Sequence, residues 1–215
     1  MASAVRPALL ALGRRDLISV APMMAWTTRA YRYLARSVSR KVRLYTEMYV
    51  ADTIHFANER QVQDMLEFDE IQRPLALQLG GSDPVRMRQA MKRALPFQYD
   101  EYNLNCGCPS DRVAGKGCFG AALMLRPELV RDVVNVMVEE ARNWSAQTGK
   151  PVPDITVKCR LGADDMDTYE EFSNFIRVVA ETGVRHFIVH ARKCWLRGLD
   201  PKANRNVPPL RYSWV

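Results

Sequence analysis

Short apolar runs alternate along the chain with longer segments whose apolar residues recur at helical spacing. Each short run is rich in β-branched or aromatic residues and ends at glycine, proline or a polar residue, which is the pattern of a β-strand. The expected strands span residues 17–23, 42–48, 74–81, 101–106, 155–162 and 186–192. The sequence therefore predicts six strands separated by helical segments.

Amphipathic helices are expected between these strands. One should cover residues 82–94, with Ser82 as its N-cap. Another carries one apolar face, made of Val130, Val133, Val134, Met137, Val138 and Ala141. A further helix should begin after Thr168, which stands in capping-box spacing with Glu171, and it should stop before Gly183.

Strict alternation of strand and helix predicts a parallel sheet covered by helices. An open doubly wound sheet would also fit six strands. However, unusual residues stand at or just after the ends of the expected strands: Pro22, Met23, Met24, Gln78, Asn105, Lys158 and His190. In a β/α barrel these ends converge on the face that carries the active site. We therefore expect an α/β fold of the (β/α)8 TIM-barrel type, incomplete here, with about six of the eight strands.

The chain shows no repeat or low-complexity tract, which predicts one structural unit over residues 17–215 after a flexible segment over residues 1–16. Its apolar runs are too short to span a membrane. We expect a cytoplasmic protein. The first residues, with arginines and no acid before Asp16, also fit a leader for an organelle such as the mitochondrion or plastid.

The net charge of +7 and the pI near 9.3 favour a polyanionic partner such as a nucleic acid. The segment HARKCWLRGLDPKANRNVPPLR concentrates basic residues around Trp195. It reads either as a loop that contacts phosphates or as an ordinary solvated loop. The five cysteines match neither a disulfide framework nor a zinc site, and we expect no metal.

Cys108 lies in the sequence GCPS, directly after the strand that contains Asn103 and Asn105. No general base stands beside it in the sequence, which argues against a protease-type nucleophile. A neutral thiol can instead give a proton, although a small buried hydrophobe is the alternative. The two asparagines are two residues apart on one strand, so both face the same side and offer donors and acceptors to the edge of a uracil or a flavin.

Gln78, Lys158 and His190 are unremarkable one by one, since lone lysines are usually solvated and lone histidines are often structural. Brought together on one face, an amide, an ammonium and an imidazole suit a planar, anionic cofactor with a phosphate group. Neither a Rossmann glycine fingerprint nor a Walker loop occurs in the sequence.

The sequence resembles the tRNA-dihydrouridine synthases, and among them the bacterial-type A subgroup. The matching segments are SVAPMMAWTTRAYRYLAR, LALQLGGSDP, YNLNCGCPSDRV, FGAALM, VKCRLG and HARKCWLRGLDPKANRNVPPLRY. They cover the chain from about Ser19 onward. The resemblance implies an FMN-dependent barrel that uses NADPH to reduce a uridine in the D-loop of tRNA to dihydrouridine, and it implies no protein partner.

The resemblance also assigns roles to residues. Cys108 matches the cysteine that protonates C5 of the uracil after hydride has passed from flavin N5 to C6. The positions that match FMN contacts are Pro22, Met23, Met24, Gln78, Lys158 and His190. The residues expected to contact the substrate uridine or the tRNA are Asn105, Gly107, Arg192, Lys202 and Arg205.

Members of this family continue beyond this sequence, with two more strands, glycine-rich phosphate loops and a small helical tRNA-binding domain. We therefore expect residues 17–215 to form the N-terminal three quarters of the barrel, to bind FMN weakly and to have little activity alone. Two alternatives stay open at this point: a non-catalytic RNA-binding remnant, and an FMN barrel that acts on a free pyrimidine.

Overall fold

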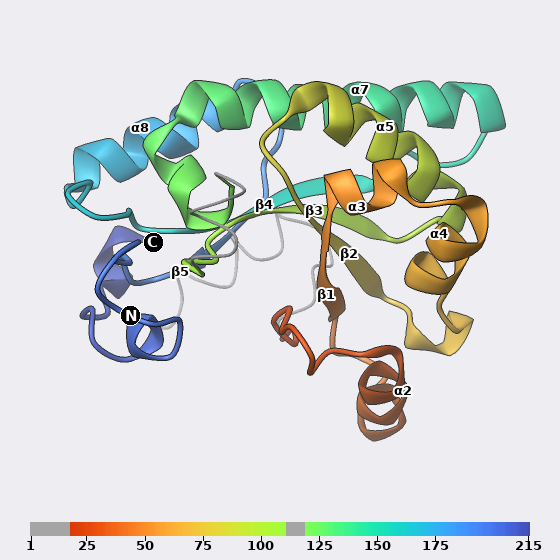
Figure 1. Cartoon of the computed structure of the whole chain (residues 1–215), viewed down its shortest axis with the longest axis horizontal. Coiled ribbons are helices and arrows are strands. Elements are labelled where there is room, and N and C mark those ends of the chain that lie inside the picture. Colours follow the sequence, from red (N-terminus) through yellow and green to blue (C-terminus); the bar gives the residue numbers. More distant parts are fainter. Residues whose placement is uncertain (1–17, 111–118) are drawn as a thin grey trace, which may run out of the picture.

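In the computed structural model, which describes residues 18–110 and 119–215, five parallel strands follow one another across a single sheet (Figure 1). The strands are β1 (Leu44–Val50), β2 (Leu75–Gly80), β3 (Glu101–Cys106), β4 (Asp154–Arg160) and β5 (Phe187–His190). Each pairs in parallel with the next one along the chain. A doubly wound sheet would reverse its strand order at a switch point, so this order confirms the barrel-type prediction.

The first expected strand, over residues 17–23, is wrong. Ser19 makes only an isolated bridge with Arg43, supported by hydrogen bonds from the Val20 N–H to the Arg43 carbonyl (2.9 Å) and from the Arg43 N–H to the Ile18 carbonyl (3.1 Å). Pairing stops there because Pro22 has no N–H to donate and the chain then turns. The described residues thus hold five strands and two isolated bridges, the second between Ala163 and Cys194. The predicted flexible segment, residues 1–16, lies outside them.

The helices are α2 (Arg29–Val38), α3 (Ala51–Phe56), α4 (Glu59–Leu66), α5 (Pro84–Ala94), α7 (Pro127–Thr148) and α8 (Tyr169–Ala180). Helices α3, α5, α7 and α8 lie along one face of the sheet, whereas α2 lies apart from them beyond β1 (Figure 1). Along that face each helix packs on the next, as in the outer layer of a β/α barrel.

The helix starts follow side-chain capping. The Thr168 hydroxyl accepts a hydrogen bond from the Glu171 N–H, and the Glu171 carboxylate bonds back, which confirms the predicted capping box of α8. The predicted N-cap Ser82 of α5 is wrong by one residue. Asp83 takes that place because its carboxylate reaches the N–H groups of Val85 and Arg86.

Alternate strand residues point toward the helices and form the apolar core. The strand residues fully buried in this core include Leu75, Leu77, Leu79, Tyr102, Leu104, Cys106, Val157 and Cys159. The apolar face predicted for α7 packs there as well, with Val138 only half-buried. Burying a leucine or valine side chain stabilises a fold by about 1.5–3 kcal/mol, so this layer holds the helices on the sheet.

The opposite face of the sheet is polar yet equally buried. We call its chain of hydrogen-bonded side chains the polar ladder; it consists of Glu101, Thr156, Asn103, Gln78 and Asn105. The successive donor–acceptor distances are 2.5, 2.8, 2.8 and 2.9 Å. All five residues are at most 8% exposed, so the ladder satisfies polar groups that would otherwise be costly to bury.

The ladder is anchored at the amino ends of the strands. The Tyr45 hydroxyl donates to the Glu101 carboxylate (2.8 Å), and the Arg43 guanidinium lies 3.2 Å from the other carboxylate oxygen. Arg43 is also the residue that bridges to Ser19. Arg43 and Glu101 therefore connect the residues around Ser19 to the centre of the sheet.

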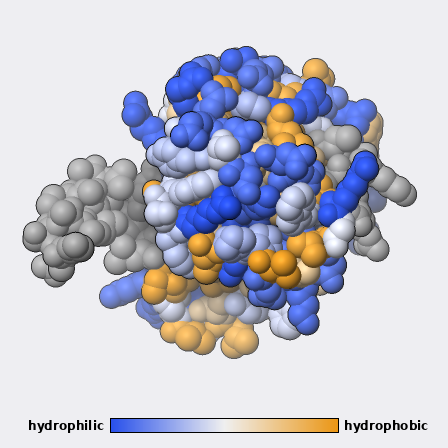
Figure 2. Space-filling view, turned by 90° about the vertical axis from the view of Figure 1, so that its left-hand side faces the viewer, coloured by the Kyte–Doolittle hydropathy of each residue, from blue (hydrophilic) through white to orange (hydrophobic). Residues whose placement is uncertain are grey.

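Apolar side chains are exposed on α2 and in the C-terminal segment, where Leu34, Val38, Leu210 and Tyr212 are between 44% and 83% exposed. Figure 2 shows the left-hand side of Figure 1, which is largely hydrophilic with hydrophobic side chains gathered mainly toward its lower edge. No helix among the described residues is long and apolar enough to cross a membrane.

The polar ladder gives a stability prediction. Replacing Thr156 by valine keeps the shape but removes the donor to Glu101 and the acceptor for Asn103. We expect the free energy of unfolding to fall by about 1–3 kcal/mol, because two buried groups lose a partner. Urea denaturation of Thr156→Val measures this loss.

The matched control is Thr148→Val, since the Thr148 hydroxyl donates to the Trp144 carbonyl on the exposed end of α7. This change should cost less than about 1 kcal/mol. Equal losses in the free energy of unfolding would show that the hydrogen bonds of the polar ladder stabilise the fold no more than an exposed hydrogen bond does.

Candidate active site

The polar ladder leads to the segment that follows β3 and carries Cys108. We call its described residues, 107–110, the Cys108 loop. The Asn105 side-chain oxygen, at the end of β3, accepts hydrogen bonds from the N–H groups of Gly107 (3.0 Å) and Cys108 (2.9 Å). The Cys108 carbonyl in turn accepts from the Ala121 N–H (2.9 Å). Cys108 is half-buried, and its backbone is fixed on both sides. The glycines Gly115 and Gly117 of the following loop lie outside the described residues.

Asn105 and Gln78, two predicted site residues, are committed to this scaffold. Both lone pairs of the Asn105 oxygen are occupied, and its amide donates to the Gln78 oxygen. The Gln78 amide donates to Asn103. Asn105 therefore keeps one amide hydrogen for a ligand, which limits it to a single donated bond.

Two predicted cofactor residues, Lys158 and His190, lie near the same strand ends. Lys158 pairs in register with Asn105, and burial lowers the pKa of its ammonium group. Burial also lowers the pKa of His190 to about 4, reinforced by the charges of Arg160, Lys158, Arg192 and Arg205. The imidazole is therefore neutral at pH 7, among groups that are all cationic. Such a site favours an anionic ligand.

Arg160 was missed by the sequence analysis. It is 3% exposed at the end of β4, opposite His190 in register. Its guanidinium donates to the carbonyls of Gly107 (2.8 Å), Lys193 (3.1 Å) and Asn204 (3.0 Å). The sequence held a signal for it, because Lys158 and Arg160 are two residues apart on one strand and so share a face.

The predicted residues Pro22, Met23 and Met24 lie at a turn that follows the bridge at Ser19. The Met23 backbone N–H and carbonyl both bond to the Thr27 hydroxyl (3.0 and 3.1 Å). Met23 is 38% and Met24 61% exposed, so their side chains are open to a ligand.

The basic loop, residues 192–206, is held from within by Asn204. The Asn204 side chain is fully buried; it accepts from the Trp195 N–H (2.8 Å) and donates to the carbonyls of Trp195 (2.9 Å) and Leu199 (3.0 Å). Lys202 and Arg205 are exposed next to it. The predicted tRNA contact Arg192 donates to backbone carbonyls of Asn206 and Pro208. Two cations of the loop thus point to solvent on a rigid support.

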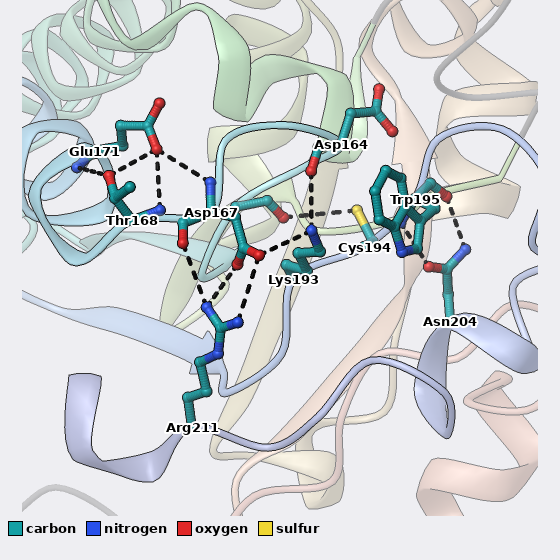
Figure 3. A network of polar contacts seen from close by, with 10 residues as sticks. Asp164, Asp167, Thr168, Glu171, Lys193, Cys194, Trp195, Asn204 and Arg211 are labelled. Carbon is teal, nitrogen blue, oxygen red and sulfur yellow. Dashed lines mark hydrogen bonds and ion pairs between the residues drawn. The ribbon is translucent and has the colours of Figure 1, made fainter.

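Lys193 belongs to a different network (Figure 3). Asp167 binds the Lys193 ammonium (3.0 Å) and the Arg211 guanidinium (2.6 Å), while the Lys193 ammonium also lies 4.1 Å from the ring centre of Trp195. Burial opposes ionisation of Asp167, but the bonds from Lys193 and Arg211 outweigh it and lower the pKa of the carboxyl group. Lys193 and Arg211 therefore act as structural cations.

Other polar and thiol groups add no second centre among the described residues. No group of histidine, cysteine and acidic side chains in that part of the chain could hold a metal ion. Cys106 is fully buried in the core, and burial raises the pKa of its thiol well above the ordinary value. Cys118 lies outside the described residues.

The fold and the site define one class of protein. A parallel β/α barrel sheet carries, at the carboxyl ends of its strands, the buried Arg160, the partly buried Lys158 and a thiol on a rigid loop. In such barrels these ends bind the ligand and carry the chemistry. The chain is thus a β/α-barrel protein with a site that suits an anionic ligand.

Comparison with known proteins gives the family. The model of the family described as dihydrouridine synthase (Dus) matches residues 19–215, and the chain belongs to this family. A protein of Xanthomonas campestris pv. campestris named tRNA-dihydrouridine(20/20a) synthase is 51% identical over 198 residues, which is 92% of this chain and 55% of the relative.

Further relatives bear the same name. One from Pasteurella multocida is 48% identical over 201 residues, covering 94% of this chain and 57% of that protein. One from Synechocystis sp. is 46% identical over 198 residues, covering 92% and 55%. The chain spans about half the length of the curated relatives that it matches.

The environment of His190 gives a prediction for pH dependence. Its pKa lies at about 4 in the folded chain and at the ordinary 6.5 when exposed, so between these values only the unfolded chain takes up the proton. Stability should therefore fall as the pH drops from about 6.5 to about 4. His190→Asn should show a shallower fall over this range in urea denaturation.

His55→Asn, a change on α3 in the helical layer that covers the sheet, is the control and should keep the wild-type slope. Identical pH profiles for His190→Asn and wild type would mean that His190 titrates normally in the folded chain.

Proposed function

We propose that this chain forms the barrel part of an FMN-dependent tRNA-dihydrouridine synthase, which uses NADPH to reduce a uridine of the tRNA D-loop to dihydrouridine. The observation that carries this proposal is the Cys108 loop. Its backbone is fixed by Asn105 at the end of β3, and Lys158 lies beside Asn105 on the next strand. This arrangement brings a proton source and a cation to the same place.

The residues proposed to hold FMN are Pro22, Met23, Met24, Gln78, Lys158 and His190. Their chemistry fits the group, because an anionic ring system and a phosphate suit a site with the partly buried Lys158 and an amide donor. Among the described residues, no carboxylate bonds to Lys158 or Arg160. A bound flavin would supply hydride to C6 of the uracil.

The chain's own residues would complete the reaction. An uncharged pyrimidine resists reduction unless negative charge on its ring is stabilised and C5 receives a proton. We assign that proton to the Cys108 thiol. The remaining amide hydrogen of Asn105 would hold the uracil edge, and Lys158 would stabilise the developing charge.

The tRNA would be gripped beside the site. A base must leave its stack to reach the end of a barrel, so the enzyme has to hold the neighbouring phosphates. We assign this contact to Gly107, Arg192, Lys202 and Arg205, of which Lys202 and Arg205 are exposed on the rigid basic loop. The relatives' name specifies positions 20 and 20a, and we propose the same positions for this protein.

The first test is FMN binding. The absorbance spectrum between about 300 and 500 nm is recorded while FMN is added. We expect a protein-bound flavin spectrum of weak affinity. Lys158→Met should weaken binding at least about tenfold, because it removes a partly buried cation from the site. Lys150→Met is the control, since Lys150 is exposed at the end of α7.

Unchanged binding by Lys158→Met would contradict the placement of FMN. The absence of any spectral change, even at millimolar FMN, would contradict flavin binding by this chain.

The second test is the reaction. With NADPH, saturating FMN and unmodified tRNA, we expect slow dihydrouridine formation, with free uridine inert as a substrate. Cys108→Ala should lower the rate by about 10²–10⁴-fold, the usual contribution of a positioned acid, and leave tRNA binding unchanged. Binding of tRNA without product in either protein would favour a non-catalytic RNA-binding protein, and turnover of free uridine would favour a metabolic enzyme.

A further inference from the structure

We propose that Arg160 is a positioning residue that couples the Cys108 loop to the basic loop, so that loss of order in the basic loop loosens the segment that carries Cys108. This inference rests on the proposed function for the role of Cys108, but the coupling itself is a property of the chain. Arg160 is suited to it because one guanidinium bonds to both loops.

On the side of the Cys108 loop, Arg160 fixes the peptide next to the thiol residue. Its Nε donates to the Gly107 carbonyl at 2.8 Å. The N–H groups of Gly107 and Cys108 bond to Asn105. Arg160 therefore holds the carbonyl side of a segment whose N–H side is held by the polar ladder.

On the side of the basic loop, the other guanidinium bonds reach two carbonyls that are themselves fixed. Nη1 of Arg160 donates to the Lys193 carbonyl (3.1 Å) and the Asn204 carbonyl (3.0 Å). Lys193 is tied to Asp167, and the Asn204 side chain clamps Trp195. The two ends of the basic loop thus meet at one side chain.

The energetics make the two loops dependent on each other. Arg160 is nearly fully buried, and burial lowers the pKa of its guanidinium. Among the described residues no carboxylate compensates it, so three backbone carbonyls carry the cost of burying the charge. If the basic loop opens, the Arg160 guanidinium loses the carbonyls of Lys193 and Asn204, which are two of its three partners. The single bond to Gly107 then no longer compensates the burial of the charge.

Lysine cannot replace Arg160 in this role. A guanidinium presents donors from Nε and both terminal nitrogens in a fixed fork, whereas an ammonium is a single point with rotating donors. Arg160→Lys therefore keeps the charge and removes the bridge. Arg93 offers a matched control elsewhere in the chain, because its guanidinium also donates to three backbone carbonyls. These are the carbonyls of Ile54, His55 and Ala57.

The experiment measures the rate at which iodoacetamide alkylates Cys108 in the purified chain, read by mass spectrometry of the peptide. We compare wild type, Asn204→Ala, Arg160→Lys and the double variant. Asn204 has no hydrogen bond to the Cys108 loop among the described residues, so an effect of Asn204→Ala on Cys108 must be transmitted. We expect each single change to raise the rate at least threefold, and the double change to exceed the larger single effect by less than twofold.

Two controls separate coupling from general unfolding. The buried thiols of Cys106 and Cys159 should stay unreactive in every variant. Arg93→Lys should leave the Cys108 rate unchanged. If Arg160→Lys exposes Cys106 or Cys159, that variant has partly unfolded. Asn204→Ala then tests the proposal by itself, because it must raise the alkylation rate of Cys108 while Cys106 and Cys159 stay unreactive.

The proposal is overturned by an unchanged Cys108 rate in Asn204→Ala, or by single effects that multiply in the double variant, since independent sites are additive in free energy. Neither flavin nor tRNA is needed for this measurement. A chain that shows the coupling yet forms no dihydrouridine would therefore contradict the proposed function and leave the inference intact.

Discussion

The continuous line of hydrogen bonds across the inner face of the sheet is the constraint on which the rest of the structure depends. The polar ladder begins at Glu101, held by Tyr45 and Arg43, and ends at Asn105 beneath Cys108. Each member is buried and uses its neighbour as its partner, so the strands are fixed in register as well as paired. A slip by one residue would turn every ladder side chain into the apolar core.

The sequence predicted the strands β1 to β5 because short apolar runs with turn residues at their ends have few other solutions. It failed for residues 17–23, where the apolar pattern is present but Pro22 and the turn after it prevent pairing. Chemistry at the strand ends was also predictable, since Asn105, Lys158 and His190 stand where barrel strands end. The hydrogen bonds of these residues were not predictable. The register between neighbouring strands decides which side chain bonds to which, and the sequence alone does not give that register.

Arg160 and Asn204 show a second limit. The spacing from Lys158 places Arg160 on the same face of β4 but does not indicate which partners its guanidinium finds, and Asn204 lies in an irregular loop. Their importance comes from contacts between segments 44 residues apart, which local spacing does not encode. Lys193 is the reverse case. The sequence left its segment open between a phosphate-contacting loop and a solvated loop, and the structure ties the Lys193 ammonium to Asp167.

The Asp167 network changes how many positive charges this surface offers to an RNA. The segment from His190 to Arg211 carries Arg192, Lys193, Arg197, Lys202, Arg205 and Arg211. The Asp167 carboxylate holds both the Lys193 ammonium and the Arg211 guanidinium, so neither side chain is free to pair with a phosphate and displace the counterions of the RNA. Binding of RNA to this segment would release ions in proportion to about four charges rather than six, which makes the affinity less sensitive to salt than the composition suggests.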